Sequence, residues 1–132
     1  PITVQINKYR ISTNRLTGDL AEQHRLEELA DKHPLIGDVR GLGMFQGVEL
    51  VTNRDTKEPA PVETAKVVYR AFELGLLVFY VGMFSNVLEI TPPLVMTQME
   101  VDEGIAILDT ALTDVQAGRV SDEIVAPFAG WS

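Results

Sequence analysis

The sequence predicts an α+β fold in which a small three-stranded sheet is packed with helices on one face. Three short apolar stretches rich in β-favouring residues, 44–51, 76–81 and 87–90, have the length and composition of strands. Three longer stretches repeat apolar residues every three or four positions, as amphipathic helices do. The predicted order is helix, strand, helix, strand, strand, helix.

Composition limits the function classes. A chain of 132 residues with 45% hydrophobic residues suits one domain with a core of its own. No apolar run approaches the roughly 18 residues of a membrane helix, and no signal-peptide pattern opens the chain. The net charge of −8 argues against a nucleic acid partner. The absence of cysteine excludes disulfides and thiolate metal sites, and it favours a cytoplasmic location.

The start of the chain has the weakest secondary-structure signals. Residues 1–18 form an unassigned leader or junction, in which the alternation over 2–7 indicates a short half-buried strand. A helix is expected from Asp19, which can cap it, to Pro34, which ends it. The apolar face of this helix is expected to hold Leu20, His24, Leu26, Leu29 and Ala30.

The middle of the chain alternates glycine-rich and apolar stretches. Arg40-Gly41-Leu42-Gly43 is expected to be a tight bend that sets the angle of the next strand. A charged loop follows, and Pro61 suits the first position of a helix that ends before Gly75. The strand at 87–90 is stopped by a double proline.

The last helix has the clearest signals. Thr97 and Glu100 form the spacing of a capping box, which predicts a helix from about Gln98 to Gln116, closed by Gly118. Residues 120–132 are a tail that is acidic and then apolar. The predicted core takes side chains from all three strands and two helices: Phe45, Val48, Val68, Phe72, Leu77, Ile90, Ile105, Leu108 and Leu112.

No residue pattern marks a catalytic centre or a metal site. Arg40-Gly41-Leu42-Gly43 resembles part of a dinucleotide fingerprint, but it enters a strand instead of opening a helix. His24 and His33 lie nine positions apart, which does not suit shared ligation, and both are expected at the surface or at a helix end. Glu49 and Glu89 are either paired carboxylates for acid–base work or, as the alternation favours, outward-facing residues.

One family resemblance covers most of the chain. Residues 26–51 read Leu-Glu-Glu-Leu-Ala-Asp-Lys-His-Pro-Leu-Ile-Gly-Asp-Val-Arg-Gly-Leu-Gly-Met-Phe-Gln-Gly-Val-Glu-Leu-Val. This stretch resembles the small-domain opening of the class III pyridoxal-phosphate-dependent aminotransferases. The resemblance continues through Asn86-Val87-Leu88 and Pro92-Pro93-Leu94 and spans about residues 20–117. It is nearest to the 4-aminobutyrate aminotransferase branch, and it implies a C-terminal small domain at 19–119, followed by the tail.

The resemblance implies that the chain is one part of an enzyme. In this family a large domain carries the Schiff-base lysine and the phosphate site, and Lys8, Lys32, Lys57 and Lys66 match no such context. The resemblance therefore implies pyridoxal phosphate in the complete enzyme, no cofactor or catalytic residue in this chain, and an inactive isolated chain. The implied partners are the missing large domain and a small-molecule substrate, with a homodimer as a further option and with no nucleic acid or membrane.

One position departs from the family pattern. Many relatives have arginine where this chain has Glu89, and that arginine binds the substrate carboxylate. Glu89, or in its place Arg40, is the expected substrate-binding residue. Two alternatives stay open: a free-standing interaction module derived from such a domain, and an unrelated small-molecule binder of similar topology.

Overall fold

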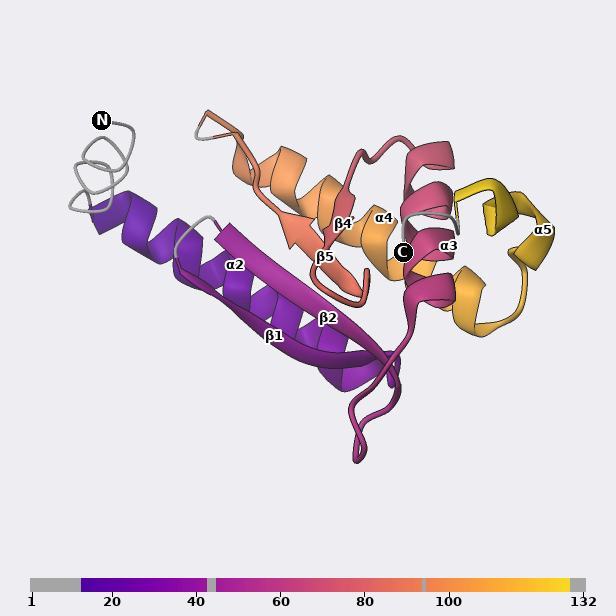
Figure 1. Cartoon of the computed structure of the whole chain (residues 1–132). Helices are drawn as coiled ribbons and strands as arrows, with labels where there is room; N and C mark the ends of the chain where they lie inside the picture. Colours follow the sequence, from indigo (N-terminus) through magenta and orange to yellow (C-terminus); the bar gives the residue numbers. More distant parts are fainter. Residues whose placement is uncertain (1–12, 43–44, 94, 129–132) are drawn as a thin grey trace.

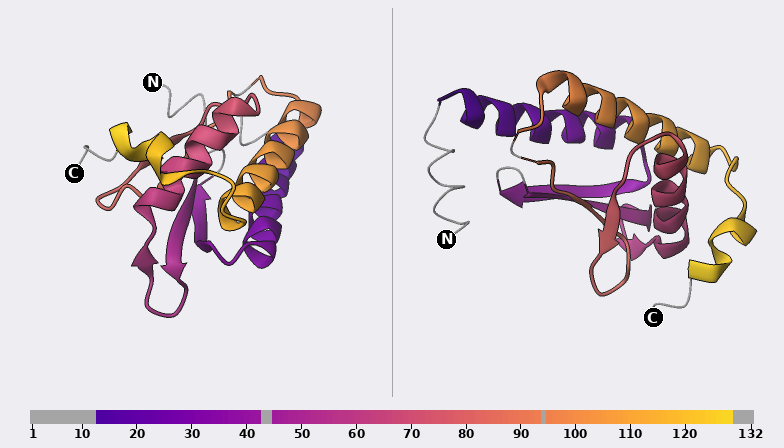
Figure 2. Two further views of the ribbon diagram at one scale, coloured as in Figure 1. Left: turned by 90° about the vertical axis from the view of Figure 1, so that its right-hand side faces the viewer. Right: turned by 90° about the horizontal axis from the view of Figure 1, so that it is seen from above.

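The computed structural model describes residues 13–42, 45–93 and 95–128. Its two layers are a sheet and the helices that cover one face of it (Figure 1). Figure 2 shows α2 and α4 side by side over that face, with α3 at one end of the sheet. The elements are α2 (Thr13–Lys32), β1 (Ile36–Leu42), β2 (Phe45–Asn53), β3 (Glu58–Pro59), α3 (Pro61–Glu73), β4 (Phe79–Val81), β5 (Val87–Ile90), α4 (Gln98–Gln116), α5 (Asp122–Val125) and a 3₁₀ turn (Ala126–Phe128).

The sheet confirms the α+β fold and is larger than the sequence predicts. Its strands are antiparallel in the order β1-β2-β5-β4, and β3 pairs with β2, so it has five strands instead of three. The bend expected over residues 40–43 is wrong for its first three residues, which lie within β1, and Gly43 lies outside the described residues. A Cβ atom on Gly41 would lie 2.0 Å from the carbonyl oxygen of Phe45. Glycine here therefore serves a close approach of two backbones in a strand pair.

The helix ends follow their local signals. The capping box of α4 is present: the Glu100 amide donates to the Thr97 hydroxyl at 3.2 Å, and the Thr97 amide donates to the Glu100 carboxylate at 2.7 Å. Pro61 begins α3, and Gly75 and Gly118 follow α3 and α4 with φ of +100° and +72°. The first helix, however, begins at Thr13 and not at Asp19. Gly18 lies inside this helix, although glycine has a low helix propensity, so the loop expected from the local sequence does not form there.

The core lies between the sheet and the helices. Of the predicted core, Val48, Leu108 and Leu112 are buried, and Val68, Ile90 and Ile105 are partly buried against them. Three predicted core residues are wrong, because Phe45, Phe72 and Leu77 are 52%, 65% and 66% exposed.

Each error has a local geometric cause. The residues of α3 that face the core are Thr64, Val67 and Ala71. Phe72 follows Ala71 directly, so the helical turn directs its side chain away from the core. Phe45 alternates with the buried Gln46 and therefore faces the other side of β2. Leu77 lies in the loop before β4. The expected strand within residues 2–7 lies outside the described residues.

Candidate functional site

The face of the sheet that the helices leave open carries both candidate site residues. Strand pairing aligns Arg40 with Gly47, Gly47 with Glu89, and Glu89 with Phe79. Because directly opposite residues share a face, these four form one row across β1, β2, β5 and β4. With adjacent strands about 4.8 Å apart, the backbones of Arg40 and Glu89 are separated by roughly 10 Å.

Arg40 already has two carboxylate partners on this face. Its Nη1 atom lies 2.6 Å from Glu49 Oε2 and 2.9 Å from Asp38 Oδ2. Hydrogen bonds to Glu49 and then to Asp38 raise the pKa of Arg40 above its usual value. The guanidinium charge is thus more than balanced, and binding a substrate carboxylate would require Arg40 to leave these partners. The assignment of Arg40 as a substrate residue stays a prediction.

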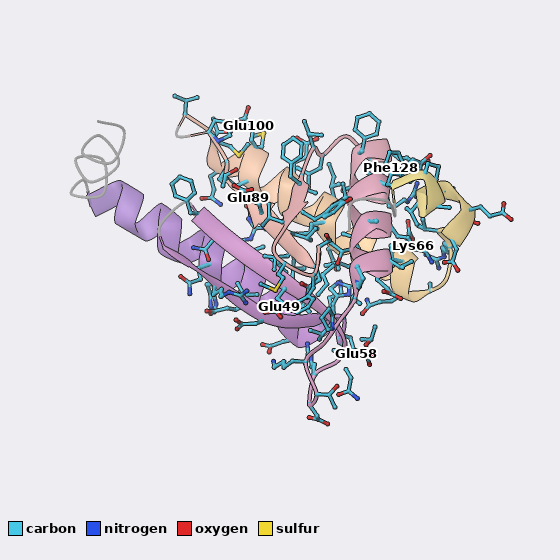
Figure 3. The ribbon with its side chains drawn as sticks, in the orientation of Figure 1. Glu49, Glu58, Lys66, Glu89, Glu100 and Phe128 are labelled. Atoms are coloured by element: carbon cyan, nitrogen blue, oxygen red, sulfur yellow. The ribbon has the colours of Figure 1, made fainter. Side chains whose placement is uncertain are left out.

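Glu89 is exposed, as the sequence predicts for an outward-facing strand residue. Within the described part of the chain, its carboxylate makes no hydrogen bond or ion pair. Glu49 and Glu89 both face outward, as the alternation favours, but they are not directly opposite: Glu49 pairs across the strands with Val87, and Arg40 binds its carboxylate. Figure 3 shows the two glutamates at separate places along the sheet.

An apolar cavity of about 220 Å³ adjoins Glu89. It lies where β5 runs into the double-proline turn and α4 begins. Glu89 contributes to its lining together with residues that are mostly apolar: Leu77, Phe79, Ile90, Pro92 and Met96. The other wall comes from α4, including Ile105 and Leu108.

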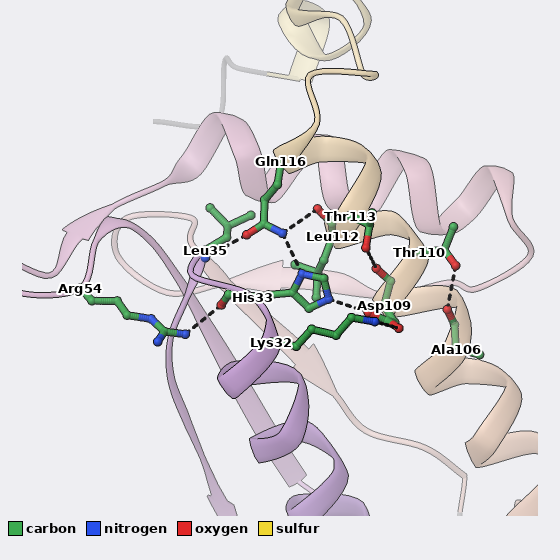
Figure 4. Close-up of polar contacts among 10 residues, drawn as sticks. All are labelled: Lys32, His33, Leu35, Arg54, Ala106, Asp109, Thr110, Leu112, Thr113 and Gln116. Carbon is green, nitrogen blue, oxygen red and sulfur yellow. Dashed lines mark hydrogen bonds and ion pairs between the residues drawn. The ribbon is translucent and has the colours of Figure 1, made fainter.

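The histidines turn out differently from one another. His24 is exposed beside Glu28, as expected for a surface histidine, so its placement on the apolar face of the helix is wrong. His33 is only 3% exposed, so it is not a surface residue, but it lies at a helix end as expected, directly after Lys32 of α2. Its Nε2 lies 2.5 Å from Asp109 Oδ1, and its Nδ1 lies 2.7 Å from Gln116 Nε2 (Figure 4). This network joins the end of α2 to α4, a non-local contact that no sequence spacing indicates.

Among the described residues, the lysines and the N-terminus of α4 already have partners within the chain. Each of the three lysines among them is occupied: Lys32 binds Asp109 at 2.6 Å, Lys57 donates to the Gly37 carbonyl at 2.8 Å, and Lys66 pairs with Asp122. The N-terminus of α4 is capped by its own Glu100 carboxylate, which leaves it unsuited to a phosphate. In the part of the chain that the structure covers, no group of three potential metal ligands occurs and no helix could span a membrane.

A family model and individual relatives both relate this chain to one enzyme family. The model of the Aminotransferase class-III family matches residues 8–112, a match that begins before the predicted domain start at residue 19. The chain is 48% identical over 107 residues to a leucine/methionine racemase of Thermococcus litoralis, covering 81% of this chain and 24% of that protein. It is 38% identical over 108 residues to the mitochondrial alanine–glyoxylate aminotransferase 2 homolog 2 of Arabidopsis thaliana, covering 82% and 23%.

A solved structure agrees with the sequence relatives. An aminotransferase of Bacillus anthracis superposes with a TM-score of 0.71 at 37% identity, covering 81% of this chain and 25% of that one. The chain thus spans about a quarter of the length of the relatives that it matches. With a family match over most of its residues and the same α+β arrangement, the chain belongs to the class III aminotransferase family.

Proposed function

We propose that this chain is the C-terminal small domain of a pyridoxal-phosphate-dependent enzyme. The complete enzyme transfers an amino group from an amine or amino acid to a 2-oxo acid. One observation carries the proposal: the family match spans residues 8–112 of the chain but only about a quarter of the relatives' length. The small domain is placed at 19–119 with a tail at 120–132, and the cysteine-free sequence favours the cytoplasm.

The cofactor belongs to the rest of the polypeptide in this proposal. Pyridoxal phosphate supplies an electron sink for the bonds at the amine-bearing carbon, and the protein must hold and orient it. The occupied lysines and the self-capped α4 support this division, because they leave no cofactor cradle in the described residues. The open sheet face with Glu89 is then the part of this domain that meets the substrate.

Glu89 also restricts the amino donor. The sequence pattern suggests the 4-aminobutyrate branch, whose substrate carries a distal carboxylate. An exposed glutamate at the position that meets it would repel a carboxylate, since like charges cost energy at short range. We therefore place the donor outside the ω-amino acids with a carboxylate at this point.

Racemisation is a second candidate, favoured by one observation. The relative with 48% identity is a leucine/methionine racemase, whereas the aminotransferase relative has 38% identity. Both reactions begin by loosening a bond at the amine-bearing carbon, so the cofactor role described above serves either.

One assay separates the two candidates. The complete polypeptide is incubated with L-methionine in the presence and absence of a 2-oxo acid, and the products are resolved by chiral chromatography. Amino transfer predicts a new amino acid that forms only with the 2-oxo acid. D-methionine formed without the 2-oxo acid would instead favour racemisation. Neither product, with methionine or with a panel of amines, would contradict the proposed function.

A further inference from the structure

The open face of the sheet is acidic around the candidate site. Asp38, Glu49 and Glu89 lie on it, and Arg40 is the cation that faces them within the described strands. Asp38 and Glu49 share the charge of Arg40, with Nη1–oxygen distances of 2.9 and 2.6 Å. Glu89 is therefore left with an uncompensated charge among the described residues, at a position open to solvent. Such a carboxylate attracts a cation and repels an anion.

An aromatic ring stands directly beside this carboxylate. Phe79 on β4 pairs with Glu89 on β5, so their Cβ atoms lie on the same face about 4.5–5.5 Å apart. Phe79 is 62% exposed, although burial would favour a ring of its size. A carboxylate next to an exposed ring face is a combination that holds organic cations, because both attract positive charge and the ring also contacts the attached methylene groups.

On the β2 side of Glu89, the neighbouring residue is a glycine and has no side chain. Gly47 pairs with Glu89 from β2, and a Cβ atom there would lie 3.2 Å from Val87 Cγ1. Arg40, beyond Gly47, is held by its own partners. A ligand therefore reaches the Glu89 carboxylate without displacing a neighbouring side chain.

We propose that Glu89 and Phe79 bind a second cationic group of the substrate, an ammonium or guanidinium distal to the reacting amine. The inference rests on the proposed function and deepens it: the substrate class is diamines or amino acids with a cationic side chain. The exposed ring of Phe79, on the same face as Glu89, offers apolar surface for the methylene chain that links the two cationic groups.

The test uses the complete enzyme and three amino donors of matched chain length: pentylamine, 1,5-diaminopentane and 5-aminopentanoate. The measured quantity is kcat/KM for each donor with one 2-oxo acid. The unmodified enzyme is expected to prefer the diamine. Glu89→Gln should lower kcat/KM for the diamine by about tenfold, because a charge-assisted contact is lost, and should leave pentylamine within about twofold.

Two further variants separate the contributions. Phe79→Leu keeps apolar area and removes the ring, so it should lower kcat/KM for the diamine by about threefold. Glu89→Arg should shift preference towards 5-aminopentanoate, since it offers a bidentate partner for a carboxylate. Glu103→Gln, an exposed glutamate on α4, is the matched control and should change none of the three values.

Three outcomes would overturn the proposal. A diamine preference that Glu89→Gln leaves unchanged, with pentylamine still turned over, would refute cation binding here while the proposed function stands. An equal loss for all three donors would show that Glu89 pairs with a cation of the protein itself. No amino transfer from any donor in any variant would refute the proposed function, and this inference with it.

Discussion

The imidazole of His33 is fixed in one tautomer by a single neighbouring side chain. Gln116 Oε1 accepts from the Leu35 amide at 3.1 Å, so its amide nitrogen must face the Leu112 carbonyl and His33 Nδ1, at 3.1 and 2.7 Å. Nδ1 therefore accepts a hydrogen bond, and the neutral ring carries its proton on Nε2, which donates to Asp109. Burial alone would raise the pKa of Asp109, but hydrogen bonds from Lys32 and His33 outweigh it and lower that pKa.

Gln116→Ala should test this residue-scale network. Removing the amide leaves the Leu35 amide and His33 Nδ1 without this partner, which should lower the free energy of unfolding by about 1–3 kcal/mol. Urea denaturation measures the change. Gln98→Ala is the control: among the described residues the Gln98 amide bonds only the exposed Asp102, so its removal should cost less than about 0.5 kcal/mol. Equal losses in the two variants would show that the network adds no stability.

Among the elements, α3 and α4 are joined by one carboxylate. Asp114 on α4, whose side chain is 8% exposed, lies 2.7 Å from Arg70 Nε on α3 and 2.7 Å from Arg119 Nη1. Hydrogen bonds from Arg70 and then Arg119 lower the pKa of Asp114 below its usual value of 3.8. The stabilisation is therefore present above pH 3.8 and is lost as the pH falls through the lowered pKa of the folded chain.

Asp114→Asn should make the chain less stable at neutral pH and should reduce the further loss of stability below pH 3.8. Thermal unfolding followed across acidic and neutral pH measures both effects. Asp55→Asn, in the exposed turn before β3, is the matched control and should leave the pH profile unchanged. An Asp114→Asn profile parallel to that of the unmodified chain would contradict the role of the α3–α4 contact.

A second element-scale prediction compares two large apolar residues. Leu108 on α4 is 1% exposed, so Leu108→Ala should lower the free energy of unfolding by about 2–5 kcal/mol. Phe72 on α3 is 65% exposed, so Phe72→Ala in the isolated chain should cost less than about 1 kcal/mol, although more atoms are removed. A loss for Phe72→Ala as large as that for Leu108→Ala would show that the assigned core face of α3 is wrong.

For the whole molecule, the sequence was informative where structure depends on neighbouring residues. The bounds of β5 and α4 were predicted, because a double proline and a capping box are local signals. β1 was missed because its glycines and charges hide a strand that exists through pairing with β2. The row that aligns Arg40 with Glu89 depends on strand register, which one sequence does not reveal.

The exposed apolar residues are a second whole-molecule property that the sequence could not place. Hydrophobicity indicates that a side chain prefers burial, but not which part of a protein buries it. Phe72 and Leu77 are each more than 60% exposed here. Large exposed apolar side chains of this kind support the proposal of a larger enzyme, in which another domain would cover them.

The central claim, that this chain supplies one domain of a larger pyridoxal phosphate enzyme, is tested most directly by one comparison. The 132-residue chain and the complete polypeptide are each incubated with pyridoxal phosphate, an amine donor and a 2-oxo acid, and amino transfer is measured. The account predicts turnover by the complete polypeptide, and neither turnover nor a borohydride-fixed lysine adduct for the chain alone. Turnover by the chain alone would contradict it.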